Sequence, residues 1–167
     1  MKYVSLEEQL HTTSVTKLLI KLSLPATAAQ MVSALYSVVD RIYISRIPNI
    51  GADALAGLGV CFPLIMFNTA ICILISSGSS ALSTIKMGEG NNKDASKLLN
   101  GSFTLLIVTG IILMAVMYLF LSPMLMFFGG SNNTLPYAVE YMEIYLLGTV
   151  VGQISLGMNY FINSQGY

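Results

Sequence analysis

The sequence is poor in charged side chains. Of its 167 residues, 10% are charged and 54% are hydrophobic, and the mean hydropathy is +0.72. A soluble domain carries about 25% charged residues. A chain of this size cannot hide so much apolar surface in one water-surrounded core. The composition therefore excludes an ordinary soluble domain and predicts a protein of the lipid bilayer.

Residues that carry enzyme, metal or nucleic-acid chemistry are also scarce. Two cysteines and one histidine are too few for zinc ligation. Cys61 and Cys72 lie in one apolar run, about 16 Å apart if it is helical, which is beyond disulfide reach, so both are interpreted as packing residues. No Ser/His/Asp set or phosphate loop occurs, and 8 Lys+Arg balance 8 Asp+Glu without a basic patch. We expect no enzyme, no cofactor and no nucleic-acid partner.

Long uncharged segments are what the sequence has instead. A spanning helix needs about 20 mostly apolar residues, and the polar stretch 1–16 lacks the pattern of a cleaved signal peptide. We therefore expect an all-α, polytopic membrane protein in which a cytoplasmic N-terminal segment, 1–16, precedes four transmembrane helices. The expected helices are 17–45, 54–85, 98–121 and 137–163. Small residues at the start of the second, among them Gly57 and Gly59, predict close contact with another helix.

The positions of lysine and arginine predict the orientation. Six lysines fall on one side of the membrane and two arginines on the other. They are Lys2, Lys17, Lys21, Lys86, Lys93 and Lys97 against Arg41 and Arg46. Because cytoplasmic loops carry the excess of positive residues, we expect a multi-pass protein of the plasma membrane with a cytoplasmic N-terminus.

Asp40 is a carboxylate near the end of the first apolar segment, and ionisable groups in spanning helices are suspected of function by default. At about 100° per residue, it shares one face of the helix with other polar residues, opposite an aliphatic face. This polar stripe consists of Gln30, Ser33, Tyr36, Ser37 and Asp40. Such a face should look into protein or water.

Two interpretations of Asp40 remain open at this point. It lies about 28 Å along a helix from Lys21, which is close to the full hydrocarbon thickness, so it can simply mark the outer end. It can instead couple transport to an ion, because burial disfavours a charged carboxylate while water or a cation favours it. Alternation between such states loads and releases a proton or a cation.

Several stretches, in this order, resemble the start of a multidrug and toxic compound extrusion (MATE) transporter. They are Pro25, VVDRIYI (38–44), GADALAG (51–57), Pro63, SGSSALSTIKMGEG (77–90), YAVEYMEIYLLG (137–148) and MNYFINSQG (158–166). The resemblance implies part of the N-terminal six-helix lobe of a twelve-helix protein, whose remaining eight helices would be its partners. It implies a secondary antiporter that exports drug-like or organic-cation compounds, cationic or amphipathic, in exchange for protons or sodium.

The resemblance also implies roles for individual residues. Asp40 matches the aspartate of the family's N-lobe proton or cation site, which makes it a possible sodium ligand, and Tyr36 matches a tyrosine near that site. Asn159 matches an asparagine near the end of the fourth helix and, with Gln30, Ser33 and Ser37, is expected to line the cavity. No bound cofactor is implied beyond the coupling ion, H⁺ or Na⁺.

Three other functions are compatible with these residues. A complete four-helix protein can act as a dimer, as in small multidrug-resistance transporters that carry one carboxylate in the first helix. A four-helix anchor or assembly subunit would have no transport of its own. A lipid-linked oligosaccharide flippase of the wider superfamily would place basic residues in its cavity, and none lies well inside these segments.

Overall fold

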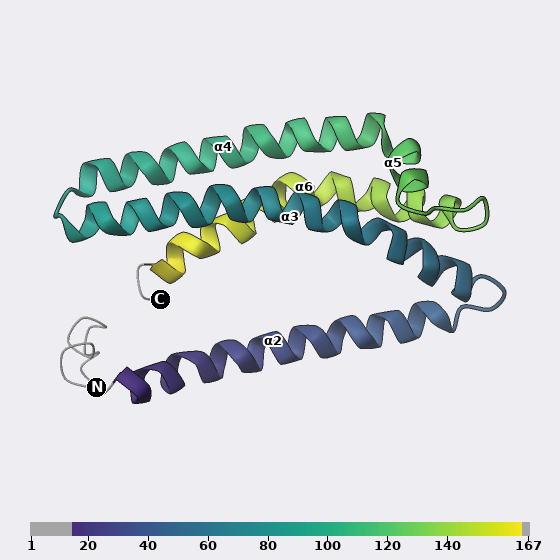
Figure 1. Ribbon diagram of the computed structural model, residues 1–167, viewed down its shortest axis with the longest axis horizontal. Helices are drawn as coiled ribbons and strands as arrows, with labels where there is room; N and C mark the ends of the chain where they lie inside the picture. The colour runs from purple at the N-terminus through teal and green to yellow at the C-terminus, as the bar shows by residue number, and fades with distance from the viewer. Residues whose placement is uncertain (1–14, 165–167) are drawn as a thin grey trace. The chain divides into compact units, whose positions relative to one another are not determined.

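The computed structural model describes residues 15–164, and no β-strand occurs in this part of the chain. The helices are α2 (Val15–Ser45), α3 (Gly51–Gly88), α4 (Asn92–Leu119), α5 (Leu121–Phe127) and α6 (Leu135–Ser164) (Figure 1). The all-α class is thereby confirmed. The expected N-terminal segment, 1–16, lies outside the described residues except for its last two. The chain divides into two compact units, 1–51 and 52–167, which are described separately.

The first unit contributes one described helix, α2. It runs through Pro25 without ending there and continues past Asp40 to Ser45. A short turn follows, in which the amides of Arg46 and Ile47 donate to the carbonyls of Tyr43 and Ile44, both at 3.2 Å. Asp40 therefore lies within the helix, more than one turn from its end.

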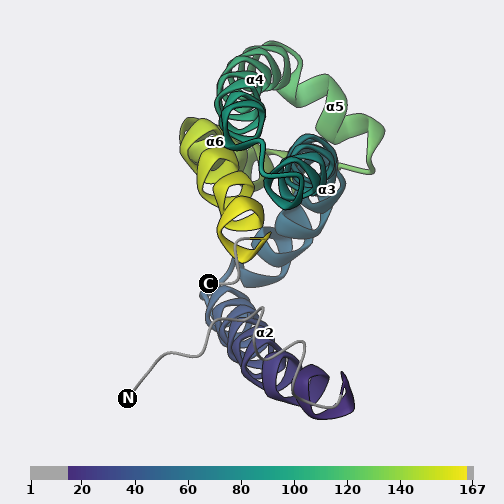
Figure 2. The same ribbon diagram turned by 90° about the vertical axis from the view of Figure 1, so that its left-hand side faces the viewer.

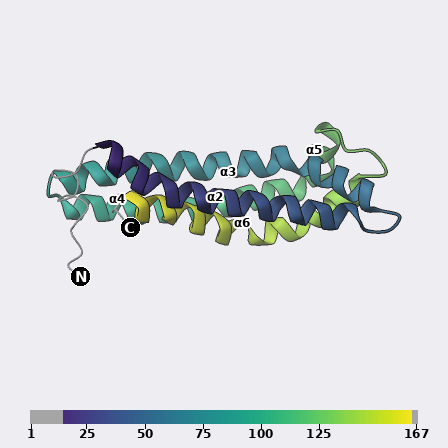
Figure 3. The same cartoon turned by 90° about the horizontal axis from the view of Figure 1, so that it is seen from below.

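The second unit is built on three long helices, α3, α4 and α6, seen nearly end-on in Figure 2. A tight loop joins α3 to α4, so the two run antiparallel, and Ser83 near the end of α3 donates its hydroxyl to the carbonyl of Ala95 near the start of α4 at 3.3 Å. Helix α6 runs parallel to α3. The short α5 and the loop after it lie at the end of this unit where α3 begins (Figure 3).

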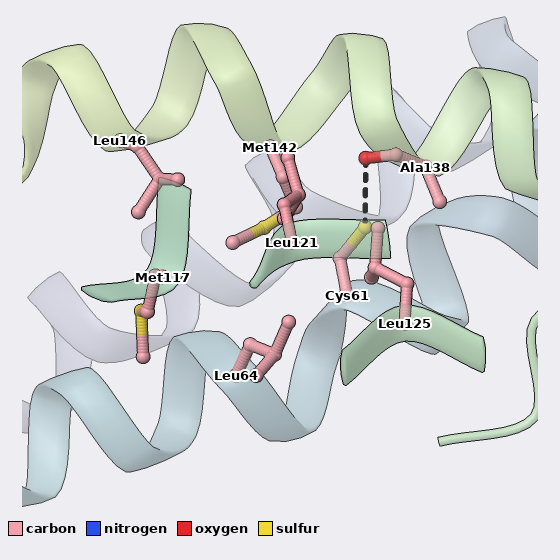
Figure 4. Packing of buried hydrophobic residues seen from close by; sticks show 8 residues of the cluster. All are labelled: Cys61, Leu64, Met117, Leu121, Leu125, Ala138, Met142 and Leu146. Carbon is pink, nitrogen blue, oxygen red and sulfur yellow. Dashed lines mark hydrogen bonds between the residues drawn. The ribbon is translucent and has the colours of Figure 1, made fainter. Parts of the chain in front are cut away.

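Apolar side chains fill the space between α3, α6 and the α4–α5 junction (Figure 4). The buried cluster consists of Cys61, Leu64, Met117, Leu121, Leu125, Ala138, Met142 and Leu146. The Cys61 thiol lies between the Gly57 carbonyl of its own helix, at 3.2 Å, and the Ala138 carbonyl of α6, at 3.5 Å, and can donate to either. In lipid the hydrophobic effect adds little between helices, because lipid tails are as apolar as leucine. Close packing and hydrogen bonds of this kind must hold the helices together.

The third predicted segment, 98–121, corresponds to α4, which ends two residues before the predicted end and is followed by a separate short helix. Helix α4 ends at Leu119, and α5 then begins at Leu121 and contains Pro123. Proline is tolerated there because the amides of a first helical turn have no partner within the helix. The break turns Leu121 and Leu125 into the core, and this packing explains why the second helix forms.

Among the described helices, α3 and α4 are long and apolar enough to cross a membrane. Polar side chains such as Glu143, Gln153 and Asn159 lower the apolar content of α6. Four spans therefore stay a prediction. Two of the four expected helices meet the requirement of length and composition.

Two ion pairs lie where α3 ends and α4 begins. Lys86 contacts Glu89 at 2.7 Å, and Lys97 contacts Asp94 at 2.9 Å. The side chain of Asn91 accepts from the Asp94 amide at 3.2 Å and caps α4. Hydrogen bonds from Lys97 and then Asn91 hold the pKa of Asp94 below its ordinary value.

Candidate functional site

The polar residues predicted on the first helix all lie on α2. Because α2 is continuous across 30–40, residues three and four apart share one face. The Ser37 hydroxyl donates to the Ser33 carbonyl at 3.1 Å, so it is satisfied within its own helix. Tyr36 is 73% exposed, and no hydrogen bond joins it to Asp40 among the described residues.

Asn159, the sixth predicted site residue, lies on α6. Its side-chain oxygen accepts from the Asn163 amide one turn later at 2.6 Å. The structure thus places five of the predicted residues on α2 in the first unit, and the sixth in the second unit. Their joint role in one cavity stays a prediction.

A second polar site, which the sequence did not reveal, lies halfway along the helices of the second unit. The Gln153 side chain of α6 donates from Nε2 to the Oδ1 of Asn68 on α3 at 2.7 Å. Both residues are buried, at 3% and 4% exposed. Asn68 is 17 residues from the start of α3 and 20 from its end (68 − 51 and 88 − 68). An uncharged amide pair therefore joins two helices near the middle of their length.

The third helix, α4, comes close to the same side chain. A Cβ built on Gly110 of α4 would lie 3.0 Å from the Gln153 Oε1, so a larger residue at this position would crowd the amide pair.

The Oδ1 of Asn68 accepts this hydrogen bond. Three buried polar atoms have no hydrogen-bond partner among the described residues: the Gln153 Oε1 and the hydroxyl oxygens of Ser76 and Ser102. A buried polar atom without a partner costs about 1–3 kcal/mol.

A groove of about 350 Å³ opens beside the amide pair. It follows one stripe of α6 and is closed on its other side by α3. The lining residues are Asn68, Thr69, Cys72, Ile144, Tyr145, Gly148, Thr149, Gly152, Gln153 and Leu156. The thiol of Cys72 donates to the Gln153 carbonyl at 3.3 Å, which holds α3 and α6 together at the base of the groove.

The groove has an aromatic side wall. The Tyr145 ring is half-buried and stacks on Tyr141 of the preceding turn, with ring centroids 6.5 Å apart and planes inclined by 15°. Thr149 donates its hydroxyl to the Tyr145 carbonyl at 3.3 Å. The combination of an amide floor, an aromatic wall and aliphatic edges is typical of sites for small organic molecules.

Comparison with known proteins agrees with this architecture. A family profile described as MatE matches residues 25–167. The chain belongs to the MatE family.

A curated relative of this MatE chain is named FAD transporter and comes from Shewanella oneidensis. The two are 26% identical over 132 residues, which cover 79% of the chain and 28% of that protein. The MatE chain thus spans less than a third of the length of this relative. No solved structure matches the chain.

Proposed function

We propose that this chain forms the first part of a secondary antiporter that exports drug-like or organic-cation compounds in exchange for protons or sodium. The match of the MatE profile to residues 25–167 carries the proposal. The relative named as a transporter supports it, as do the two helices long and apolar enough to span a bilayer.

The proposed topology has α2, α3, α4 and α6 as four spans of the plasma membrane with a cytoplasmic N-terminus. The lysines of the α3–α4 loop support this orientation by the positive-inside rule. Green fluorescent protein fused after Gly90 should then fluoresce, and alkaline phosphatase fused after Ser131 should be active. The opposite pattern would refute the orientation.

Asp40 is the proposed coupling residue, with Tyr36 beside it. The carboxylate would release its proton or sodium ion when an organic cation binds, and would be reloaded from the other side of the membrane. Gln30, Ser33, Ser37 and Asn159 are further residues proposed to line the cavity. Membership of the MatE family favours this function over a dimeric small multidrug-resistance protein and over an anchor without transport.

Transport by the complete gene product in proteoliposomes tests the proposal. Ethidium and FAD are tested as substrates, the latter because of the relative's name. An imposed pH or sodium gradient should drive uptake against the substrate gradient, and Asp40→Asn should abolish it. Asp53→Asn, in the first turn of α3, is the matched control and should transport normally.

Transport without gradient dependence would contradict the antiport mechanism. Equal transport by wild type and Asp40→Asn would remove Asp40 from it. If neither compound moves under any gradient, the proposed substrate classes are wrong.

A further inference from the structure

We propose that a buried water molecule binds between the hydroxyl groups of Ser76 on α3 and Ser102 on α4, where it joins the two helices by hydrogen bonds. The water site belongs to the packing of the second unit and is independent of the proposed transport function.

The core of the second unit is apolar at one end and polar at the other. Toward the α3–α4 loop, the buried apolar cluster ends at Leu64 on α3, Met117 on α4 and Leu146 on α6. The buried polar side chains of the described residues all lie beyond it, on the loop side. They are Asn68, Ser76, Ser80, Ser83, Ser102, Thr149 and Gln153. Because buried polar groups need hydrogen-bond partners, bound water is expected at this end of the core.

Ser76 and Ser102 lie opposite each other on α3 and α4. The two helices run antiparallel, and the Ser83 hydroxyl donates to the Ala95 carbonyl across their interface. Ser76 lies seven residues before Ser83, and Ser102 lies seven residues after Ala95, which is close to two turns in each helix. This register brings both serines to the same level of the same interface. Both are buried, at 0% and 3% exposed.

The hydroxyls of Ser76 and Ser102 are both without a hydrogen-bond partner among the described residues. Several other hydroxyls of α3 and α4 donate to a carbonyl of their own helix, namely those of Thr69, Ser80, Thr84, Thr104 and Thr109. The Cys72 side chain adjoins Ser76, but its thiol donates to the Gln153 carbonyl and sulfur is only a weak acceptor. Two facing hydroxyls therefore lack a strong partner.

A water molecule is the ligand that suits this position. Buried waters typically make about three hydrogen bonds to polar groups that are otherwise unsatisfied. The two serines supply two such bonds, and a helix carbonyl, which has a second lone pair, can supply the third. Gly157 of α6 limits the space, because a Cβ there would lie 2.7 Å from the Ser76 Oγ and would clash with the Leu106 side chain. The close packing of α6 excludes a larger ligand on that side.

Alanine variants of the complete gene product test whether one water joins both serines. A water held by both hydroxyls is lost when either is removed, and the remaining hydroxyl then has no partner. Ser76→Ala and Ser102→Ala should therefore each melt about 2 °C below Ser77→Ala, and the double variant should melt no lower than the single ones. Ser77→Ala is the matched control, because Ser77 is the next residue of α3 and is exposed.

X-ray radiolytic labelling detects the water more directly, because radicals formed from a bound water oxidise the side chains next to it. Cys72 and Cys61 are a matched pair for this purpose. Both are fully buried, and Cys72 adjoins Ser76, whereas Cys61 lies in the apolar cluster. Peptide mass spectrometry should find Cys72 oxidised and Cys61 unchanged, and Ser76→Ala should abolish the oxidation of Cys72.

Each measurement has a result that overturns the water site. A melting temperature of Ser76→Ala or Ser102→Ala equal to or above that of Ser77→Ala would show that the serine binds no water. Additive losses in the double variant would show that the two serines share no ligand. Equal oxidation of Cys61 and Cys72, or oxidation of Cys72 that persists in Ser76→Ala, would show that no water is held at Ser76.

Discussion

Gly57 offers the sharpest test of the packing between α3 and α6. A Cβ at this position would lie 2.9 Å from the carbonyl oxygen of Thr134 and 3.2 Å from the amide nitrogen of Ala138. Both are backbone atoms, which cannot move aside by changing a rotamer. Gly57→Ala must therefore push the start of α6 away from α3.

Gly59, two residues later in the same helix, provides the control. A Cβ there meets nothing within 4 Å. Alanine is favoured over glycine in a helix by about 1 kcal/mol, and this gain applies equally at both positions. The difference between the two variants therefore isolates the clash.

The expected magnitude follows from overpacking. One methyl group forced into a well-packed contact costs about 1–3 kcal/mol, so Gly57→Ala should be less stable than Gly59→Ala by that amount. In a chain of this size each kcal/mol shifts the melting temperature by about 2–4 °C. Fluorescence-detected size-exclusion chromatography of heated, detergent-solubilised protein measures this shift.

The comparison with Gly59→Ala makes the result decisive. Equal melting temperatures for Gly57→Ala and Gly59→Ala would refute the close approach of α3 and α6 at Thr134. A lower melting temperature for Gly59→Ala than for Gly57→Ala would indicate that Gly59, and not Gly57, faces α6.

Two further predictions concern the charged loop and the thiols. The pKa of Asp94 is lowered in the folded state, so its carboxylate stabilises the fold above the unfolded pKa, about 3.9. This contribution is lost as pH falls through the lower folded pKa, so acid unfolding followed by circular dichroism should show a smaller loss of stability between about pH 5 and 2 in Asp94→Asn than in wild type. Identical curves would contradict the pairing of Asp94 with Lys97 and Asn91. Cys61 and Cys72 are both fully buried free thiols. Peptide mass spectrometry should therefore find neither cysteine labelled by maleimide in the native protein and both labelled after denaturation. Labelling of Cys72 in the native protein would show that the base of the groove is open.

The long helices could be anticipated from the sequence because uncharged runs determine where a chain can cross lipid. The predicted segments 54–85 and 137–163 lie within α3 and α6. The end of the third segment near Leu121 was predicted, two residues beyond the end of α4, but the short helix α5 that follows was not. Only the packing of Leu121 and Leu125 into the core shows why α5 turns away, although Pro123 was a local signal.

The amide pair could not be found from the sequence. Asn68 and Gln153 are 85 residues apart, and each by itself is an ordinary polar residue in an apolar segment. Their pairing depends on the parallel register of α3 and α6. The same limit applies to Gly57 and Gly59, which look equivalent in the sequence although only Gly57 contacts α6.

Coupling through Asp40 is the central claim, and its most direct test is the binding of a cation at different pH and sodium concentrations. Tetraphenylphosphonium binding to the complete gene product should weaken in wild type as either protons or sodium ions are added, because the coupling ion competes for the carboxylate. In Asp40→Asn the affinity should be independent of both. The same dependence on protons or sodium in Asp40→Asn as in wild type would contradict the account.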